Sequence, residues 1–137
     1  MKLLPERARE ALPRVDPARL HWGWPIGLRD GAILALLAAG LTPEEIPAVR
    51  AAAVTMVRGR VSIALRRHGV PWVVILTADL GAHVLAWINE RRLWASPEHL
   101  FSGIQGPLDP LSILQVMYRY WNERKARRRS SRARKTA

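Results

Sequence analysis

Outside its arginines, the sequence offers few side chains at the spacing that chemistry requires. Its histidines show no His-x-x-x-His pair, and there is no cysteine, so neither a zinc site nor a thiol nucleophile is predicted. These histidines are His21, His68, His83 and His99. Glu44 and Glu45 suit a helix start, where carboxylates favour the dipole, better than paired-carboxylate catalysis. Residues 103–106 lack the lysine and strand of a phosphate-binding loop, so no cofactor is predicted.

Positive charge is the strongest chemical signal. The net charge is +11, and residues 119–137 hold nine of the 22 Lys and Arg residues and one of the 11 acidic ones, which leaves +3 for the rest. Such a tail suits a phosphate backbone, although a charge run is also typical of a solubilising end. The expected phosphate-binding residues are Arg58, Arg60, Arg66, Arg67, Arg124, Lys125, Arg127, Arg128, Arg129, Arg132, Arg134 and Lys135.

The size and composition suit one soluble domain. The 137 residues are 49% hydrophobic, enough for a single core. The longest apolar runs, such as 32–41 and 70–76, fall well short of the ~20 residues of a membrane span, and charges near the start interrupt any signal peptide. The absence of disulfides fits a reducing compartment. We therefore expect a cytoplasmic, nucleoid-associated protein without membrane contact.

The segment 28–46 predicts a buried central helix followed by a second helix. Apolar residues between Ile33 and Leu37 recur at helical spacing and are too concentrated for a surface helix, and Gly40 ends it. Thr42 and Glu45 form a capping box with Pro43 at the first helical position. The second helix is therefore expected to start at Thr42 or Pro43.

A β-hairpin is predicted after a turn around residues 58–59. Residues 61–65 alternate and are rich in β-branched side chains, residues 66–69 contain turn residues, and 70–76 form a second strand candidate. Pro71 lies near the start of that strand, where a missing donor matters least. These two runs predict an antiparallel pair.

Two further helices are predicted on the C-terminal side. Thr77 or Asp79 caps the first, which ends near residue 91 or 94 and has the apolar stripe Leu80, Val84, Leu85 and Ile88, with Trp87 off that stripe. Gly and Pro residues predict a loop over 96–108. The last helix is expected from residue 109 or 110 to 121, fraying into the basic tail.

The expected fold class is therefore α+β and mostly α: two N-terminal helices, a small antiparallel hairpin, two more helices and a basic C-terminal extension. Residues 1–20 are interpreted as an N-terminal arm, with two helical turns over 6–12 that Pro13 stops. Residues 21–122 form the domain and 123–137 the tail. Trp22 and Trp24 are expected to cap the core.

The order of residue types over 28–46 is more specific than two consecutive helices would require. It reads Leu-Arg-Asp-Gly-Ala-Ile-Leu-Ala-Leu-Leu-Ala-Ala-Gly-Leu-Thr-Pro-Glu-Glu-Ile. This resembles the opening of the catalytic domain of tyrosine recombinases (phage integrases), where Arg-Asp, an apolar helix, Thr-Gly-Leu-Arg and a Ser-Glu-Leu helix start follow one another. Residues 100–101 and 106–108 match a later Leu-Phe and a Pro-Leu-Ser-like helix start. The resemblance covers about residues 28–120 and implies a small sheet after the first two helices.

The resemblance also implies that the catalytic groups are missing. The family's first catalytic arginine corresponds to Thr42, and its lysine to Arg66 or Arg67, which can bind phosphate but are too basic to donate a proton. The His-x-x-Arg motif and the nucleophilic tyrosine are expected to be absent, because an arginine-rich tail stands where they would begin, beyond residue 120. Tyr118 and Tyr120 precede that place and are interpreted as packing and rim residues.

We therefore expect a catalytically inactive, DNA-binding relative of the tyrosine recombinases, from a phage, plasmid or other mobile element. The alternative is a protein-binding regulator of a recombinase or of transcription or replication machinery. It would present tryptophans to its partner, since aromatic residues and arginine dominate protein interfaces. Those tryptophans are Trp22, Trp24, Trp72, Trp94 and Trp121. RNA is a third possible ligand of the tail.

Overall fold

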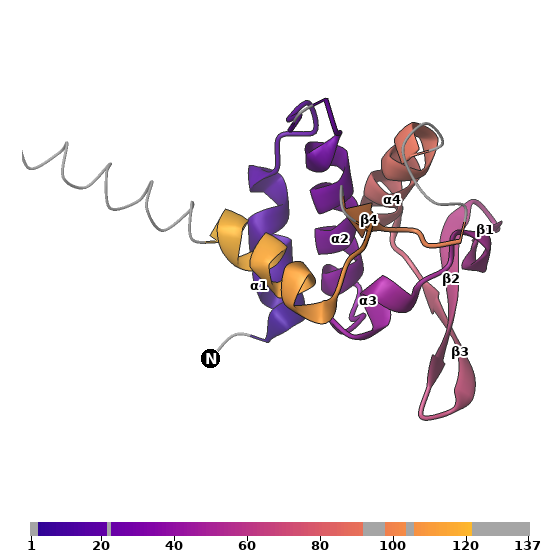
Figure 1. Cartoon of the computed structure of the whole chain (residues 1–137). Helices are drawn as coiled ribbons and strands as arrows, with labels where there is room; N and C mark the ends of the chain where they lie inside the picture. Colours follow the sequence, from indigo (N-terminus) through magenta and orange to yellow (C-terminus); the bar gives the residue numbers. More distant parts are fainter. Residues whose placement is uncertain (1–2, 22, 92–97, 104–105, 122–137) are drawn as a thin grey trace, which may run out of the picture.

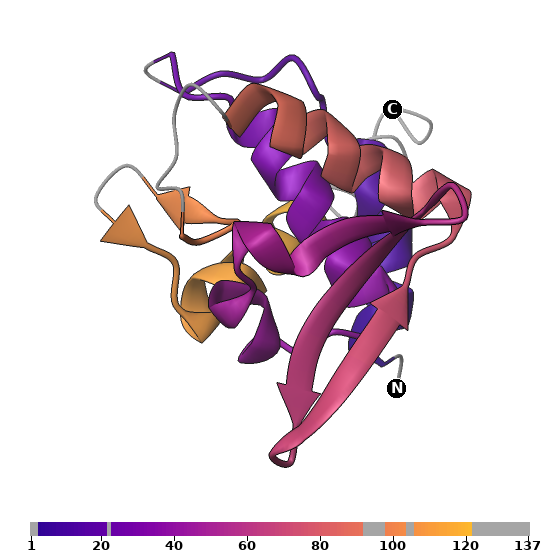
Figure 2. The ribbon, with the colours of Figure 1, turned by 90° about the vertical axis from the view of Figure 1, so that its right-hand side faces the viewer.

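The computed structural model describes residues 3–21, 23–91, 98–103 and 106–121. Helices, a three-stranded antiparallel sheet and a small two-stranded one make up the described fold, so the expected mostly-α α+β class is confirmed (Figures 1 and 2). The elements are α1 (Leu4–Ala11), η1 (Leu12–Arg14), α2 (Ile26–Ala38), α3 (Glu45–Ala48), η2 (Ala51–Ala53), β1 (Val54–Val57), β2 (Arg60–Arg67), β3 (Val70–Ile75), α4 (Ala78–Arg91), β4 (Ser102–Gly103), β5 (Gly106–Pro107) and a helix over 110–121.

Helix α2 is the centre of the core. All side chains from Ala32 to Leu37 are fully buried, because α2 packs against α1 on one side and α4 on the other (Figure 1). The expected central helix is thus confirmed. Helix α1 buries Ala8 and Ala11 completely against this layer, so residues 4–11 contribute to the core.

The second predicted helix is much shorter than expected. After Gly40, the capping residues lead into α3, which has a single turn. The chain then leaves the helix because residues 49–51 pair with a distant segment: the Leu100 N–H donates to the Val49 carbonyl, and the Ala51 N–H donates to the Glu98 carbonyl. Pro47, which has no backbone N–H, already weakens the local helical signal, and the long-range contact ends the helix after one turn.

The sheet has the order β1-β2-β3, and both of its turns have two residues. Positive φ angles at Arg58 and Gly59, and again at His68 and Gly69, are those of type I′ turns, which match the twist of a hairpin. The predicted pairing of 61–65 with 70–76 is confirmed, but β1 was not foreseen. The prediction that Arg66 and Arg67 lie in the turn was wrong, because β2 continues through Arg67 and the turn consists of His68 and Gly69.

Helix α4 packs on α2 with the stripe Leu80, Val84, Trp87 and Arg91. The predicted assignment of Leu85 to the core was therefore wrong, since this side chain is 37% exposed. Trp87 instead lies in the core, where its indole Nε1 donates to the Leu100 carbonyl at 2.8 Å.

The last predicted helix is present over residues 110–121, with the Asp109 carboxylate accepting from the Ser112 N–H at 2.8 Å. Ile113, Val116 and Met117 bury its inner face. Of the predicted 96–108 loop, the structure describes residues 98–103 and 106–108. Leu100 and Phe101 in this segment are buried. Among the described helices, none has both the length and the apolar character to cross a bilayer.

Candidate nucleic-acid interface

The capping box at the start of α3 is formed as the sequence predicts. The Glu45 N–H donates to Thr42 Oγ1 at 3.1 Å, and the Thr42 N–H donates to Glu45 Oε1 at 2.9 Å. These reciprocal bonds satisfy two backbone donors at the helix start and fix the Glu45 carboxylate beside Thr42.

Arg67, at the end of β2, closes onto the same carboxylate. Its Nε lies 2.9 Å from Glu45 Oε2, and its Nη2 donates to Glu45 Oε1 and to the Gly40 carbonyl, each at 3.2 Å. The guanidinium also lies 5.7 Å from the centre of the Trp72 ring, within cation–π range. We refer to Gly40, Thr42, Glu45 and Arg67 as the α3 corner.

The α3 corner favours its charged form. Burial would raise the pKa of Glu45, but the hydrogen bonds from Arg67 and Thr42 and the charge of Arg67 outweigh it and hold this pKa below 4.5. The hydrogen bond to Glu45 in turn raises the pKa of Arg67. In this arrangement the Glu45 carboxylate already pairs with the Arg67 guanidinium, in the place that an anionic ligand would take.

The α3 corner brings together two segments that are far apart in the chain. Thr42 lies just after α2, and Arg67 ends β2. The two positions are linked through Glu45. The pairing of Glu45 with Arg67 could not be predicted from residue spacing, because the position of Glu45 is fully explained by helix capping alone.

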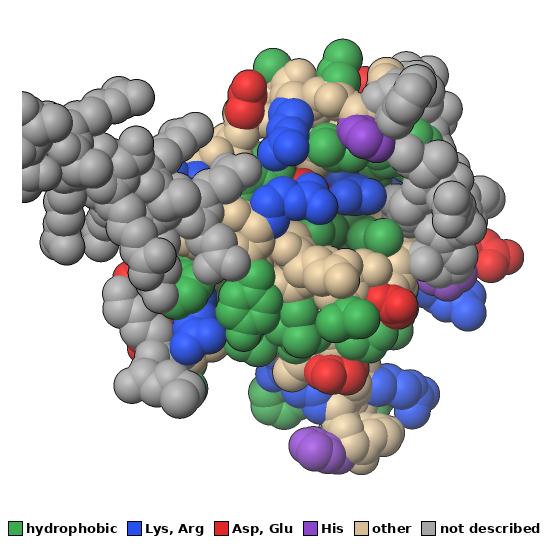
Figure 3. Space-filling view, turned by 60° about the vertical axis from the view of Figure 1, so that its left-hand side comes forward, with side chains coloured by type: hydrophobic (Ala, Val, Ile, Leu, Met, Phe, Trp, Pro, Cys, Tyr) green, Lys and Arg blue, Asp and Glu red, His purple; other side chains and the backbone are tan. Residues whose placement is uncertain are grey.

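The remaining sheet arginines are exposed. Arg58 lies in the β1–β2 turn, Arg60 begins β2, and Arg66 lies near its other end, with Nη1 donating to the Gly69 carbonyl at 3.2 Å. Arg60 and Arg66 share a face of β2 and their backbones are about 20 Å apart. None of the three forms an ion pair within the described residues. Figure 3 shows basic side chains and a histidine at the end of the hairpin, which projects from the body.

The sequence around the sheet contains no neutralising charge. From residue 47 to residue 77 there are five arginines and no acidic residue. Arg50, which the sequence analysis missed, is the fifth; it is exposed just before β1, and its backbone pairs with His99. The composition of this segment would have signalled it. Within the described fold, the sheet is therefore a positively charged surface, and it lies next to the α3 corner.

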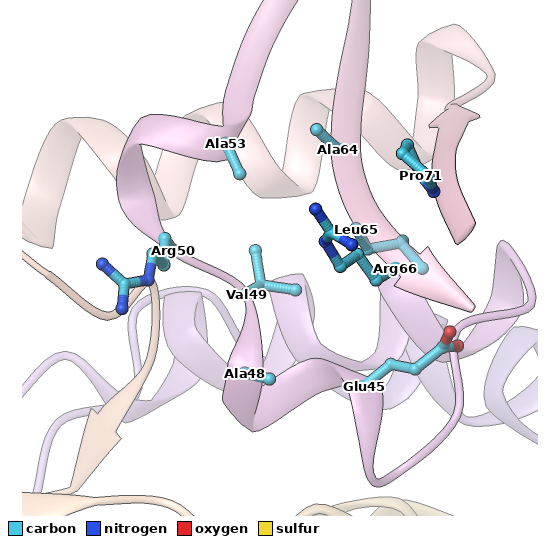
Figure 4. Close-up of a pocket in the computed structure, with 9 residues that line it drawn as sticks. All are labelled: Glu45, Ala48, Val49, Arg50, Ala53, Ala64, Leu65, Arg66 and Pro71. Carbon is cyan, nitrogen blue, oxygen red and sulfur yellow. The ribbon is translucent and has the colours of Figure 1, made fainter. Parts of the chain in front are cut away.

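A groove of about 530 Å³ separates the α3–η2 segment from the hairpin (Figure 4). Its lining is mostly aliphatic, with Arg50, Arg66 and Glu45 as the charged members. The complete lining is Glu45, Ala48, Val49, Arg50, Ala53, Ala64, Leu65, Arg66 and Pro71.

The other predicted site residues fall into two groups. Eight of the predicted phosphate-binding residues, from Arg124 to Lys135, lie outside the described residues, as do Trp22 and Trp94. Among the tryptophans of the alternative hypothesis, Trp72 is 49% exposed, whereas Trp24 and Trp121 are partly buried. Only Trp72 adjoins the positive sheet.

Tyr120 has a structural environment. Its hydroxyl donates to Asp30 Oδ2 at 2.8 Å, and Arg29 pairs with the other carboxylate oxygen of this fully buried aspartate at 3.0 Å. Burial, together with the negative charge of Asp30, raises the pKa of Tyr120 well above 10. Such a phenol is a poor nucleophile, and Tyr118 lies exposed on the same helix. Within the described residues, no three His, Asp or Glu side chains gather into a metal site.

In comparisons with known proteins, no family model, no curated protein and no solved structure matches the chain.

Proposed function

We propose that this protein is a DNA-binding relative of the tyrosine recombinases that does not cut DNA. The observation that carries the proposal is the α3 corner, where the two positions that the resemblance assigns to phosphate contacts lie together. One of them is Thr42, which has no charge, and the cation of the other, Arg67, is held by Glu45. A scissile phosphate would have to displace this carboxylate.

DNA binding is supported by the charge and shape of the sheet. Arg58, Arg60 and Arg66 are exposed along one projecting element, in a segment without acidic residues. A spacing of about 20 Å between the backbones of Arg60 and Arg66 is several times the 3.4 Å rise of one base pair, so that the two can reach different phosphates. The cations of the tail, residues 124–135, would add affinity without sequence readout.

The proposal is tested by mobility-shift measurements with a short duplex over a range of salt concentrations. The full chain is compared with R58Q/R60Q and with R9Q/R19Q, which removes two exposed arginines from the N-terminal segment and has the same net charge. We expect R58Q/R60Q to make the negative slope of log K against log salt shallower by about two, and the control to leave it nearly unchanged. Equal effects of the two variants would reduce the sheet to a contributor of net charge only.

The absence of cleavage is tested separately. The full chain is incubated with negatively supercoiled DNA, and the products are separated under denaturing conditions. We expect neither nicked DNA nor a protein–DNA adduct, because Thr42 cannot clamp a phosphate. An adduct would overturn this part of the proposal while leaving DNA binding intact.

A further inference from the structure

The groove between the α3–η2 segment and the hairpin combines an apolar floor with a positive rim. Val49 and Ala53 lie on one side, and Ala64 and Pro71 on the other (Figure 4). The floor continues along the hairpin, because Ala64 pairs with Val73 and cross-strand partners share a face of a sheet. Val73 is 58% exposed, so the apolar surface extends beyond the groove itself.

The charges at this groove are unbalanced. Both arginines of the lining are exposed, and in Figure 4 Arg66 reaches over the floor, whereas the Arg50 side chain points outward from the α3–η2 edge. Glu45 is the one acidic residue of the lining, and its carboxylate is bound to Arg67 and to the Thr42 N–H. One guanidinium group therefore lies over the apolar floor and a second at its outer edge, with no carboxylate left for either in the lining.

We propose that this groove binds a short acidic segment of a partner protein, with an apolar side chain on the floor and carboxylates on Arg50 and Arg66. Bidentate pairing with carboxylates is the geometry that guanidinium groups favour. The function goes beyond DNA binding, and the two can fail independently.

The lining favours a peptide over the other occupants with complementary charge. Single-stranded nucleic acid binds by stacking bases on aromatic rings, and the groove lining contains none. A duplex would satisfy the arginines but would leave the aliphatic floor uncovered. A second copy of this chain is disfavoured because each copy has a net charge of +11.

The test uses the full chain and a fluorescent peptide of alternating glutamate and leucine, with a glutamine–leucine peptide as the neutral control. Binding is followed by anisotropy. We expect R50Q/R66Q to weaken binding of the acidic peptide about tenfold or more, and R9Q/R19Q, which loses the same charge elsewhere, to weaken it less than about twofold. The neutral peptide should bind at least about tenfold more weakly than the acidic one.

A second variant separates the groove from its charges. Ala64→Trp fills the groove from an exposed strand position that tolerates aromatic residues and leaves every arginine in place. We expect it to block the peptide while the far-UV circular-dichroism spectrum remains that of the folded protein. The proposal is overturned if wild-type protein does not bind the acidic peptide, if both peptides bind equally, if R9Q/R19Q matches R50Q/R66Q, or if Ala64→Trp has no effect. None of these outcomes would decide whether the protein binds DNA.

Discussion

The substitution Glu45→Gln tests the α3 corner in two independent ways. Glutamine is nearly the same size and keeps an oxygen that can accept from the Thr42 N–H, so the variant removes mainly the charge that holds Arg67. The side chains of Glu45 and Arg67 are 15% and 30% exposed, which places the pair between a surface and a buried salt bridge. We therefore expect the free energy of unfolding to fall by about 1 kcal/mol.

The assay is urea unfolding followed by tryptophan fluorescence at neutral pH. Glu44→Gln is the matched control, because Glu44 is exposed and carries the same charge one residue away. In a double-mutant cycle with Arg67→Gln, the coupling between positions 45 and 67 should be about 1 kcal/mol. A coupling near zero, or an equal effect of Glu44→Gln, would refute the interpretation of the corner as an occupied cation site.

The pH dependence has a defined sign. Because the folded pKa of Glu45 is lowered, the unfolded chain takes up its proton first as the pH falls. The stability difference between wild type and Glu45→Gln should therefore be complete above the ordinary value of 4.5 and vanish as the pH falls through the lowered pKa. A difference that persists unchanged in strong acid would contradict an ionic origin.

The same variant should affect DNA binding in the opposite direction. Freeing Arg67 adds an unpaired cation at the end of the hairpin, so the slope of log K against log salt for a duplex should steepen by about one in Glu45→Gln. Glu44→Gln should not change it comparably. A variant that is less stable yet binds duplex more tightly at low salt would distinguish release of Arg67 from general damage.

Three further substitutions test the core and the turns, each by urea unfolding. Tyr120→Phe removes a hydrogen bond to the buried Asp30 carboxylate, and we expect a loss of about 1–3 kcal/mol; a neutral result would mean that water replaces the hydroxyl. Trp87→Phe removes the donor to the Leu100 carbonyl and leaves a void, for about 2–3 kcal/mol, with less than 1 kcal/mol contradicting the packing described. Gly59→Ala should cost about 1–2 kcal/mol because φ is +79° there, and an unchanged midpoint would argue against the type I′ turn.

The sequence predicted best the elements whose signals are local. The aliphatic residues over 32–37 recur at helical spacing and are too concentrated for a surface helix, and two separate Gly-containing dipeptides mark the hairpin turns. The Thr42–Glu45 capping box was also readable, because it depends on residues three positions apart. The local signal did not predict which side of α4 faces the core. Leu85 and Trp87 are two positions apart, and it is Trp87 that packs in the core while Leu85 is exposed.

Long-range pairing could not be read from the sequence. Pro47 is a local signal against a long second helix, but the pairing of residues 49–51 with residues 98–100, which follows the single turn of α3, is signalled by neither segment. Strand β1 follows an alanine run and has only one partly buried residue, so no alternation revealed it. The contact between Glu45 and Arg67 likewise depends on how the hairpin is placed beside α3, and the groove with Arg50 arises from that same placement.

Mapping the surface that contacts DNA is the most direct test of the proposed function. Amide and arginine Nε–Hε resonances of the full chain can be followed by ¹H–¹⁵N NMR as a short duplex is added. We expect the largest shifts over residues 58–69 and at the Nε–Hε groups of Arg58, Arg60 and Arg66, with little change in α1 and α4. Shifts confined to α1 and α4, or none on the sheet at saturating duplex, would contradict a DNA-binding role for this sheet.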